Sequence, residues 1–98
     1  MSLKKQYLKS KPICKVTFVF DKLPADNVAV IGDFNNWDTS VNQLKKLKNG
    51  SFKATINLES DHSYQFRYFV DGSYLNEDDA DGLLWNDFAA DNNCLLNV

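Results

Sequence analysis

The sequence predicts an all-β protein, an immunoglobulin-like antiparallel β-sandwich of about seven strands. Short apolar runs recur along the chain, and several of them alternate apolar and polar residues. Turn signals such as Asn49-Gly50 and Asp71-Gly72 separate these runs, and no stretch has a sustained helical period. The 98 residues correspond to one domain, with a modest core that needs neither a metal nor a disulfide.

The first third of the chain contains a tail and two strands. Residues 1–12 have no sustained periodicity and are expected to form a flexible basic N-terminal arm, so that the domain spans 13–98. Strict alternation over residues 14–20 indicates a half-buried strand. After a connection that contains Pro24, a strand is expected over residues 27–31, because the apolar run 28–31 is typical of a buried strand.

A turn with an unusual residue follows that second strand. Gly32-Asp33 and Asn35-Asn36 are residues that tolerate tight turns, and Trp37 comes directly after them. Two interpretations of Trp37 are open. The ring folds back over the end of the core, or it is a flat platform at the sheet edge for a molecule outside the protein.

A first hairpin is expected around Asn49-Gly50, between residues 43–48 and 51–58. Asn-Gly between alternating runs is a strong signal for a short hairpin. Within the second run, alternate residues should face the core: Phe52, Ala54, Ile56 and Leu58.

A second hairpin, formed by residues 64–70 and 73–75 around Asp71-Gly72, supports an argument about register. A two-residue turn places Phe69 directly opposite Tyr74. The even positions of the first strand are the more apolar ones and should face the core, so Phe69 and Tyr74 face outward with Arg67. The sequence therefore predicts one cation and two aromatic rings together on the wet side of a sheet.

The last quarter of the chain is expected to be a long polar loop and a closing strand. Residues 76–91 are polar with a few apolar side chains, and residues 93–98 form the last apolar run. A loop of this length in a small domain is more often functional than idle.

Charge and cysteine content indicate which partners and which cellular compartment to expect. The net charge of −2 gives no reason to expect nucleic acid or an anionic membrane as a partner. Neither a membrane-length apolar run nor the apolar region of a signal peptide is present, so a cytoplasmic location is expected. Cys14 and Cys94 are interpreted as buried free thiols, although a disulfide is open if the first and last strands are neighbours.

The sequence favours binding over catalysis. A glycoside hydrolase needs two carboxylates that face each other across a cleft, whereas the acidic residues 77–82 lie in an expected loop. That loop does not fit an EF-hand, because Phe88 stands where the bidentate Glu is required. His62, the single histidine, lies in an expected turn. We therefore expect no catalytic residue, no metal and no cofactor.

Two motifs carry a resemblance to a known family. The first is Val-Ala-Val-Ile-Gly-Asp-Phe-Asn-Asn-Trp-Asp, and the second is Tyr-Gln-Phe-Arg-Tyr-Phe-Val-Asp-Gly-Ser-Tyr, followed later by Asp-Asn-Asn. Together they resemble the family-48 carbohydrate-binding modules. These include the early-set β-sandwiches of isoamylases and glycogen-branching enzymes, and the glycogen-binding domain of AMP-activated protein kinase β subunits. The resemblance covers residues 15–98.

By position, the resemblance implies a sugar site. Trp37 matches a sugar-stacking tryptophan, and Arg67 stands in place of a lysine that bonds to sugar hydroxyls. Tyr74 stands where a second tryptophan is usual, with Leu75 as an alternative.

The later part of the implied site lies near the end of the chain. Phe88 falls near a leucine that inserts into a bent glucan, and Asn92 matches a sugar-bonding asparagine, with Asn93 as a one-residue alternative. Ala90 departs from the family by replacing a hydroxyl-bearing residue. The implied function is non-catalytic binding of α-1,4-linked glucan, with a glycogen-metabolising enzyme as a further partner. The alternative is a protein-interaction or packing module with little sugar affinity.

Overall fold

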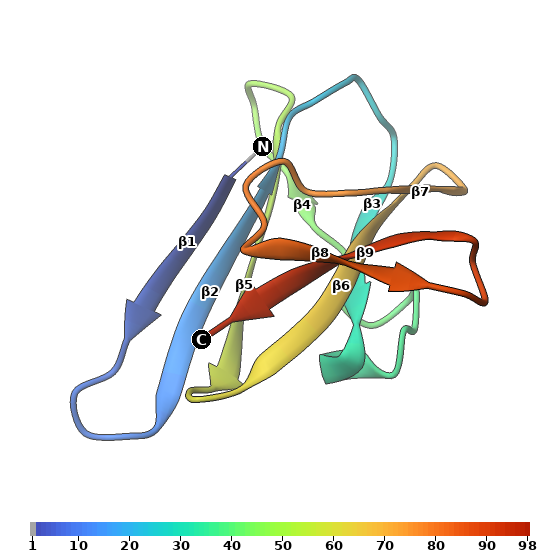
Figure 1. The fold of residues 1–98 in the computed structure, drawn as a ribbon. Helices are drawn as coiled ribbons and strands as arrows, with labels where there is room; N and C mark the ends of the chain where they lie inside the picture. Colours follow the sequence, from blue (N-terminus) through green and yellow to red (C-terminus); the bar gives the residue numbers. More distant parts are fainter. Residues whose placement is uncertain (1) are drawn as a thin grey trace.

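The computed structural model describes residues 2–98 and consists of two antiparallel β-sheets packed face to face (Figure 1). The four-stranded sheet has the order β1 (Ser2–Tyr7), β2 (Ile13–Phe20), β5 (Phe52–Glu59) and β4 (Lys45–Lys46). The five-stranded sheet has the order β3 (Val28–Gly32), β6 (Ser63–Val70), β9 (Asp91–Asn97) and β8 (Gly82–Asn86), with β7 (Ser73–Leu75) also paired to β6. The predicted antiparallel β-sandwich is confirmed, with two strands more than the seven expected. Among the described residues no helix has the length and apolar content needed to cross a bilayer.

The two additional strands lie where the sequence predicts irregular chain. Ser2–Tyr7, expected to belong to a loose arm, pairs along its whole length with β2. Its side chains are at most half-buried, which is why no clear alternation marks it. The strand is also tied to the opposite sheet, because Lys5 Nζ lies 2.7 Å from the Asp81 carboxylate.

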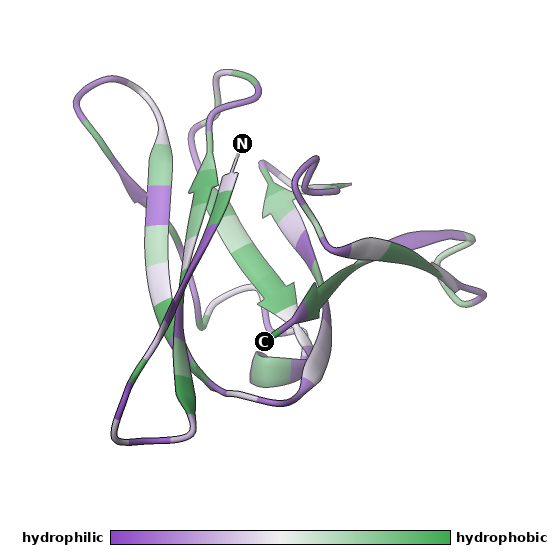
Figure 2. Ribbon diagram, turned by 60° about the vertical axis from the view of Figure 1, so that its left-hand side comes forward, coloured by the Kyte–Doolittle hydropathy of each residue, from purple (hydrophilic) through white to green (hydrophobic). Residues whose placement is uncertain are grey.

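The second additional strand is β8, which lies inside the expected loop 76–91 and pairs with β9. Leu83, Leu84 and Trp85, which look like isolated apolar residues in a loop, are consecutive residues of this strand. The β8–β9 hairpin projects beyond the rest of the sandwich (Figures 1 and 2). Because it projects, its side chains lack the burial pattern that makes a strand recognisable in a sequence.

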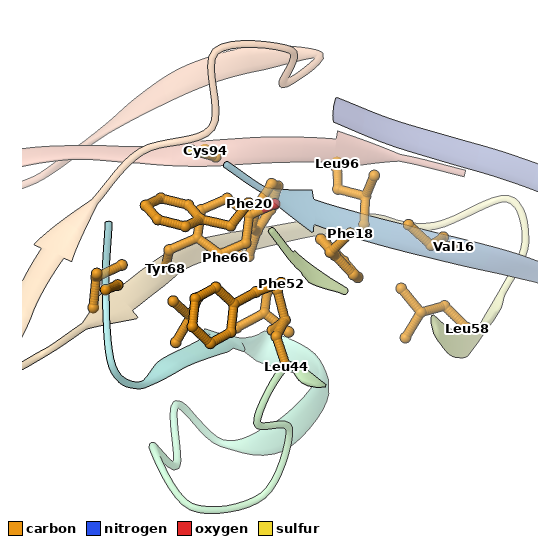
Figure 3. Close-up of a cluster of buried hydrophobic side chains, with 14 of the residues drawn as sticks. Val16, Phe18, Phe20, Leu44, Phe52, Leu58, Phe66, Tyr68, Cys94 and Leu96 are labelled. Carbon is orange, nitrogen blue, oxygen red and sulfur yellow. The ribbon is translucent and has the colours of Figure 1, made fainter. Parts of the chain in front are cut away.

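The core lies between the two sheets and follows the predicted alternation. Hydrophobic residues alternate with hydrophilic ones along the strands, and the connecting loops are mostly hydrophilic (Figure 2). The four inward residues of β2 are fully buried: Cys14, Val16, Phe18 and Phe20. Phe18 packs edge-on against Phe66 of β6 at 5.4 Å between ring centroids, so the two sheets are joined by aromatic contacts (Figure 3).

The polar groups of Tyr68 and Glu77 are buried together in this part of the structure. Tyr68 is fully buried, and its hydroxyl donates to the Glu77 carboxylate at 2.7 Å. Burial, reinforced by the charge of Glu77, raises the pKa of Tyr68 above its ordinary value. The Glu77 backbone N–H in turn donates to the Cys94 sulfur at 3.1 Å. These bonds fasten the connection between β7 and β8 to the core.

Cys14 and Cys94 are both buried free thiols, as the first interpretation of the sequence had it. Burial raises the pKa of the Cys94 thiol, which makes it less nucleophilic.

Candidate functional site

The predicted register of the β6–β7 hairpin is confirmed. Phe69 is paired with Tyr74 across the turn, and both turn residues, Asp71 and Gly72, have positive φ. A turn with two positive φ angles matches the twist of the strands it connects. The Phe69 and Tyr74 rings lie 5.2 Å apart on the outer face of the five-stranded sheet, and Tyr74 is 54% exposed.

Arg67 lies on the same outer face, but it is not on the wet side as predicted. Only 6% of the residue is exposed. Its guanidinium is 5.4 Å from the centroid of the Tyr74 ring. Nε donates to Asn76 Oδ1 and Nη2 to Asp91 Oδ2, both at 2.9 Å. The outward direction was predicted correctly, and the exposure was wrong.

The topology of β6 explains why Arg67 is covered. Along one edge of β6, residues 63–66 pair with β9 and residues 68–70 pair with β7. Arg67 lies at the junction where β6 changes partners. Asn76 directly follows β7 and Asp91 begins β9, so both reach the guanidinium from this junction. Neither residue was predicted to belong to the site.

This arrangement lowers the pKa of Asp91. The backbone N–H of Asn92 donates to its carboxylate at 2.7 Å, and Arg67 donates to the other oxygen. The N–H of Asn92, and after it the hydrogen bond and charge of Arg67, hold the pKa of Asp91 below its ordinary value. The carboxylate is therefore charged at neutral pH, and Arg67 is held in one orientation.

Trp37 ends a rigid turn that begins at the last residue of β3. A short 3₁₀ turn, η1 (Asp33–Asn35), is followed by left-handed backbone at Asn36 and Trp37, with φ of 55° and 58°. The Trp37 backbone N–H donates to the Gly32 carbonyl at 3.0 Å. The Asn35 side chain bonds to the Gly32 and Val30 backbones, which holds the turn together.

The indole of Trp37 is half-buried and is not one of the core side chains. Its Nε1 donates to one Asp33 oxygen at 3.2 Å, and the other Asp33 oxygen accepts the Gln65 backbone N–H at 2.8 Å. Trp37 is thus linked through one carboxylate to β6, two residues from Arg67.

Asn92 and Asn93 point to opposite sides of the sheet. Asn93 is 4% exposed and donates to Gln65 Oε1 at 3.1 Å. Since Gln65 and Arg67 alternate with the core-facing residues of β6, Asn93 belongs to their outer face. Asn92 is its neighbour in β9, so its side chain faces the other way. Asn93 Oδ1 is buried and has no hydrogen-bond partner in the described part of the chain.

Phe88 is at the tip of the β8–β9 hairpin and is fully exposed, at 102%. The fold thus places Arg67, Tyr74 and Asn93 on one outer face, with Trp37 linked to that face through Asp33. It places Phe88 at the tip of the projecting hairpin, and Asn92 on the opposite face of the hairpin from Asn93, called here the reverse face. Leu75, the alternative to Tyr74, pairs with Tyr68 on the core side and is packed against the core.

Two of the depressions in the surface of the described residues bear on the expected site. A wide one of about 870 Å³ lies at the end of the sandwich, lined by the connection 21–26 and by Asn49, Gly50 and Ser51, and it contains none of the six expected site residues. A smaller one of about 340 Å³ adjoins Phe69, with Ala29 and Gln43 in its lining. Only the smaller one adjoins the outer face that carries Arg67 and Tyr74.

Within residues 2–98 no group of three or more His, Cys, Asp or Glu side chains could hold a metal ion. A small antiparallel sandwich with aromatic rings, a guanidinium and an amide on one outer sheet face has the features of a carbohydrate-binding module, a class of non-catalytic domains. The family model described as the glycogen recognition site of AMP-activated protein kinase matches residues 14–97. Because this match spans most of the chain, the protein belongs to that family. A search of curated proteins found no match.

Proposed function

We propose that this protein binds α-1,4-linked glucan, as glycogen, starch or malto-oligosaccharide, on the outer face of the five-stranded sheet, without catalysing its conversion. The observation that carries the proposal is the half-exposed Tyr74 ring beside a guanidinium that is already fixed by Asn76 and Asp91. The membership of the glycogen-recognition family supports the same ligand.

The chemistry of glucose suits these groups. Each sugar unit has faces of C–H bonds, which an aromatic ring covers, and a rim of hydroxyls that need hydrogen-bond partners when they lose water. Tyr74 and Trp37 are the proposed stacking rings. Arg67 retains N–H donors that its two bonds to Asn76 and Asp91 do not use. Asn93 lies on the same face, and its buried Oδ1 has no hydrogen-bond partner among residues 2–98.

The preorganisation of Arg67 affects the strength of binding. A free arginine side chain must be immobilised when it binds, whereas this one is already held, so less conformational entropy is lost. Full burial of an aromatic side chain contributes about 1.5–3 kcal/mol, and a sugar covers only part of a ring. Two such stacks and a few hydrogen bonds, less the cost of association, correspond to a Kd between about micromolar and millimolar. Repeated sites on a polymer would raise the apparent affinity.

The cellular compartment, the protein partner and the role of Phe88 are part of the same proposal. Two buried free thiols suit a reducing compartment, which favours the cytoplasm. Since binding alone leaves a glucan unchanged, a glycogen-metabolising enzyme is the proposed protein partner. Phe88, at the hairpin tip, is proposed to contact the glucan from the side of the sheet.

The test compares two tyrosines of equal exposure. Tyr74 and Tyr7 are 54% and 56% exposed, but Tyr7 is in β1 of the other sheet. We expect Tyr74→Ala to weaken co-sedimentation with glycogen and calorimetric binding of maltoheptaose about tenfold, and Tyr7→Ala to change neither. Wild-type protein that binds no maltoheptaose at millimolar concentration would contradict the proposal and favour the protein-interaction alternative.

A further inference from the structure

The β8–β9 hairpin carries a second exposed aromatic surface, separate from the outer face that contains Arg67 and Tyr74. Of the nine large hydrophobic side chains exposed within residues 2–98, four are in this hairpin: Leu83, Leu84, Trp85 and Phe88. Trp85 is 62% exposed, more than any other of them except Phe88 at the tip. Leu83 and Trp85 alternate with Leu84 along β8, so exposed apolar side chains lie on both faces of the projecting hairpin, and such side chains indicate a contact surface.

The strand register assigns Trp85 to the reverse face of the hairpin. Trp85 is directly opposite Asn92, and Leu84 is directly opposite Asn93. Directly opposed residues of an antiparallel pair share a face. Since Asn93 bonds to Gln65 on the outer face, Trp85 and Asn92 lie together on the other side.

The groups on this reverse face suit a sugar better than they suit a purely apolar partner. The Trp85 indole N–H donates to the Asp87 carboxylate, which fixes the orientation of a ring that is 62% exposed. The Asn92 side-chain amide makes no hydrogen bond to any other part of residues 2–98, so it has a donor and an acceptor available. A ring with an unpaired amide beside it can cover the C–H face of a sugar and bond to its hydroxyls.

The position of the hairpin favours one ligand for both faces. A two-stranded ribbon is a single backbone layer thick, so its two faces are close in space. The hairpin projects from the sandwich (Figure 1), and Phe88, in the turn that connects β8 to β9, is fully exposed. A curved glucan chain, or two branches of one polymer, can therefore contact the outer face and the reverse face together.

We propose that Trp85 and Asn92 form a second glucan contact on the reverse face of the β8–β9 hairpin. This inference rests on the proposed function, because it takes the same α-glucan as the ligand. The second contact allows a polymer to be held at two places on one domain.

The experiment uses the fact that the chain contains only two tryptophans. In an amide–nitrogen NMR correlation spectrum of the wild-type protein, the two indole N–H signals are assigned from their loss in Trp37→Phe and Trp85→Phe. Maltoheptaose is then added to the wild type, with cellohexaose, which has β-1,4 linkages, as the control sugar. We expect both indole signals to shift with maltoheptaose and neither to shift with cellohexaose. We also expect Trp85→Ala to bind glycogen about five- to tenfold more weakly, while Tyr7→Ala binds like the wild type.

The outcomes separate the two proposals. If only the Trp37 signal shifts and Trp85→Ala binds glycogen normally, the second contact is wrong and the proposed function stands. If neither signal shifts and glycogen is not bound, both are wrong. If the Trp85 signal instead moves with protein concentration in the absence of sugar, the hairpin is a self-association surface and the inference is overturned.

Discussion

Gly32 is the position where a single methyl group should be most damaging to this fold. It is the last residue of β3, where it pairs with Phe66. A Cβ atom built on Gly32 would lie 2.4 Å from the Gln65 carbonyl oxygen, 2.9 Å from Phe66 Cβ and 3.0 Å from Phe34 Cε2. The first of these atoms is backbone within β6, so it cannot move away without disturbing the β3–β6 ladder.

The expected loss follows from that geometry. Inserting a methyl group into a filled site costs about 1–3 kcal/mol, and contact with a fixed backbone atom places Gly32→Ala near the upper end. For a domain of this size, that corresponds to a melting temperature lower by about 10–20 °C. Gly32 also stabilises the turn that contains Trp37, because its carbonyl accepts a hydrogen bond from the Trp37 N–H. Glucan binding should therefore weaken as well.

The chain provides a matched control in Gly82, at the start of β8. A Cβ there would meet only Leu95 Cδ2 at 3.4 Å and Leu95 Cβ at 3.7 Å. Alanine also restricts the unfolded chain, which stabilises by about 0.4–1 kcal/mol where the fold accepts it. We expect Gly82→Ala to melt at or slightly above the wild-type temperature, followed by circular dichroism and checked by urea titration. A Gly32→Ala protein that melts like Gly82→Ala would refute the argument.

Two further predictions concern the core and acid stability. Phe18→Ala should lower the free energy of unfolding by about 3–5 kcal/mol, because Phe18 is fully buried. Phe88→Ala makes the same change at a fully exposed ring and should leave urea unfolding unchanged. Equal effects of the two substitutions would contradict the assigned core. Asp91 has a pKa lowered in the folded state, so its stabilising contribution is present above about pH 4 and is lost as the pH falls through the folded pKa. The stability difference between wild type and Asp91→Asn should accordingly shrink between about pH 6 and pH 2. A carboxyl NMR titration that gives Asp91 a pKa at or above the ordinary value would show that Arg67 and Asn92 do not hold the carboxylate as described.

The strands that bury one face could be predicted from local pattern. In β2 and β5 the apolar residues alternate, and each strand packs against the core along its length. The Asp71-Gly72 turn fixed the register of Phe69 and Tyr74 for a local reason as well, since a two-residue turn admits one pairing.

β1 and β8 could not be predicted in the same way. Both are edge strands, and none of their side chains is buried, so neither shows the alternation that burial would impose. An apolar run bounded by turn residues, Leu83-Leu84-Trp85 between Gly82 and Asn86, is the one signal that could have identified β8.

The sequence by itself determined the sandwich, its inward residues and the outward direction of Arg67 and Tyr74, because alternation and turn chemistry act between neighbours along the chain. Only the tertiary structure decided that Arg67 is covered, since Asn76 and Asp91 reach it where β6 exchanges one partner strand for another. The same holds for the opposite orientation of Asn92 and Asn93, which depends on how β9 pairs with β8 and contacts β6. Pairing between strands distant in sequence is set by the burial of the whole core, and no local pattern specifies it.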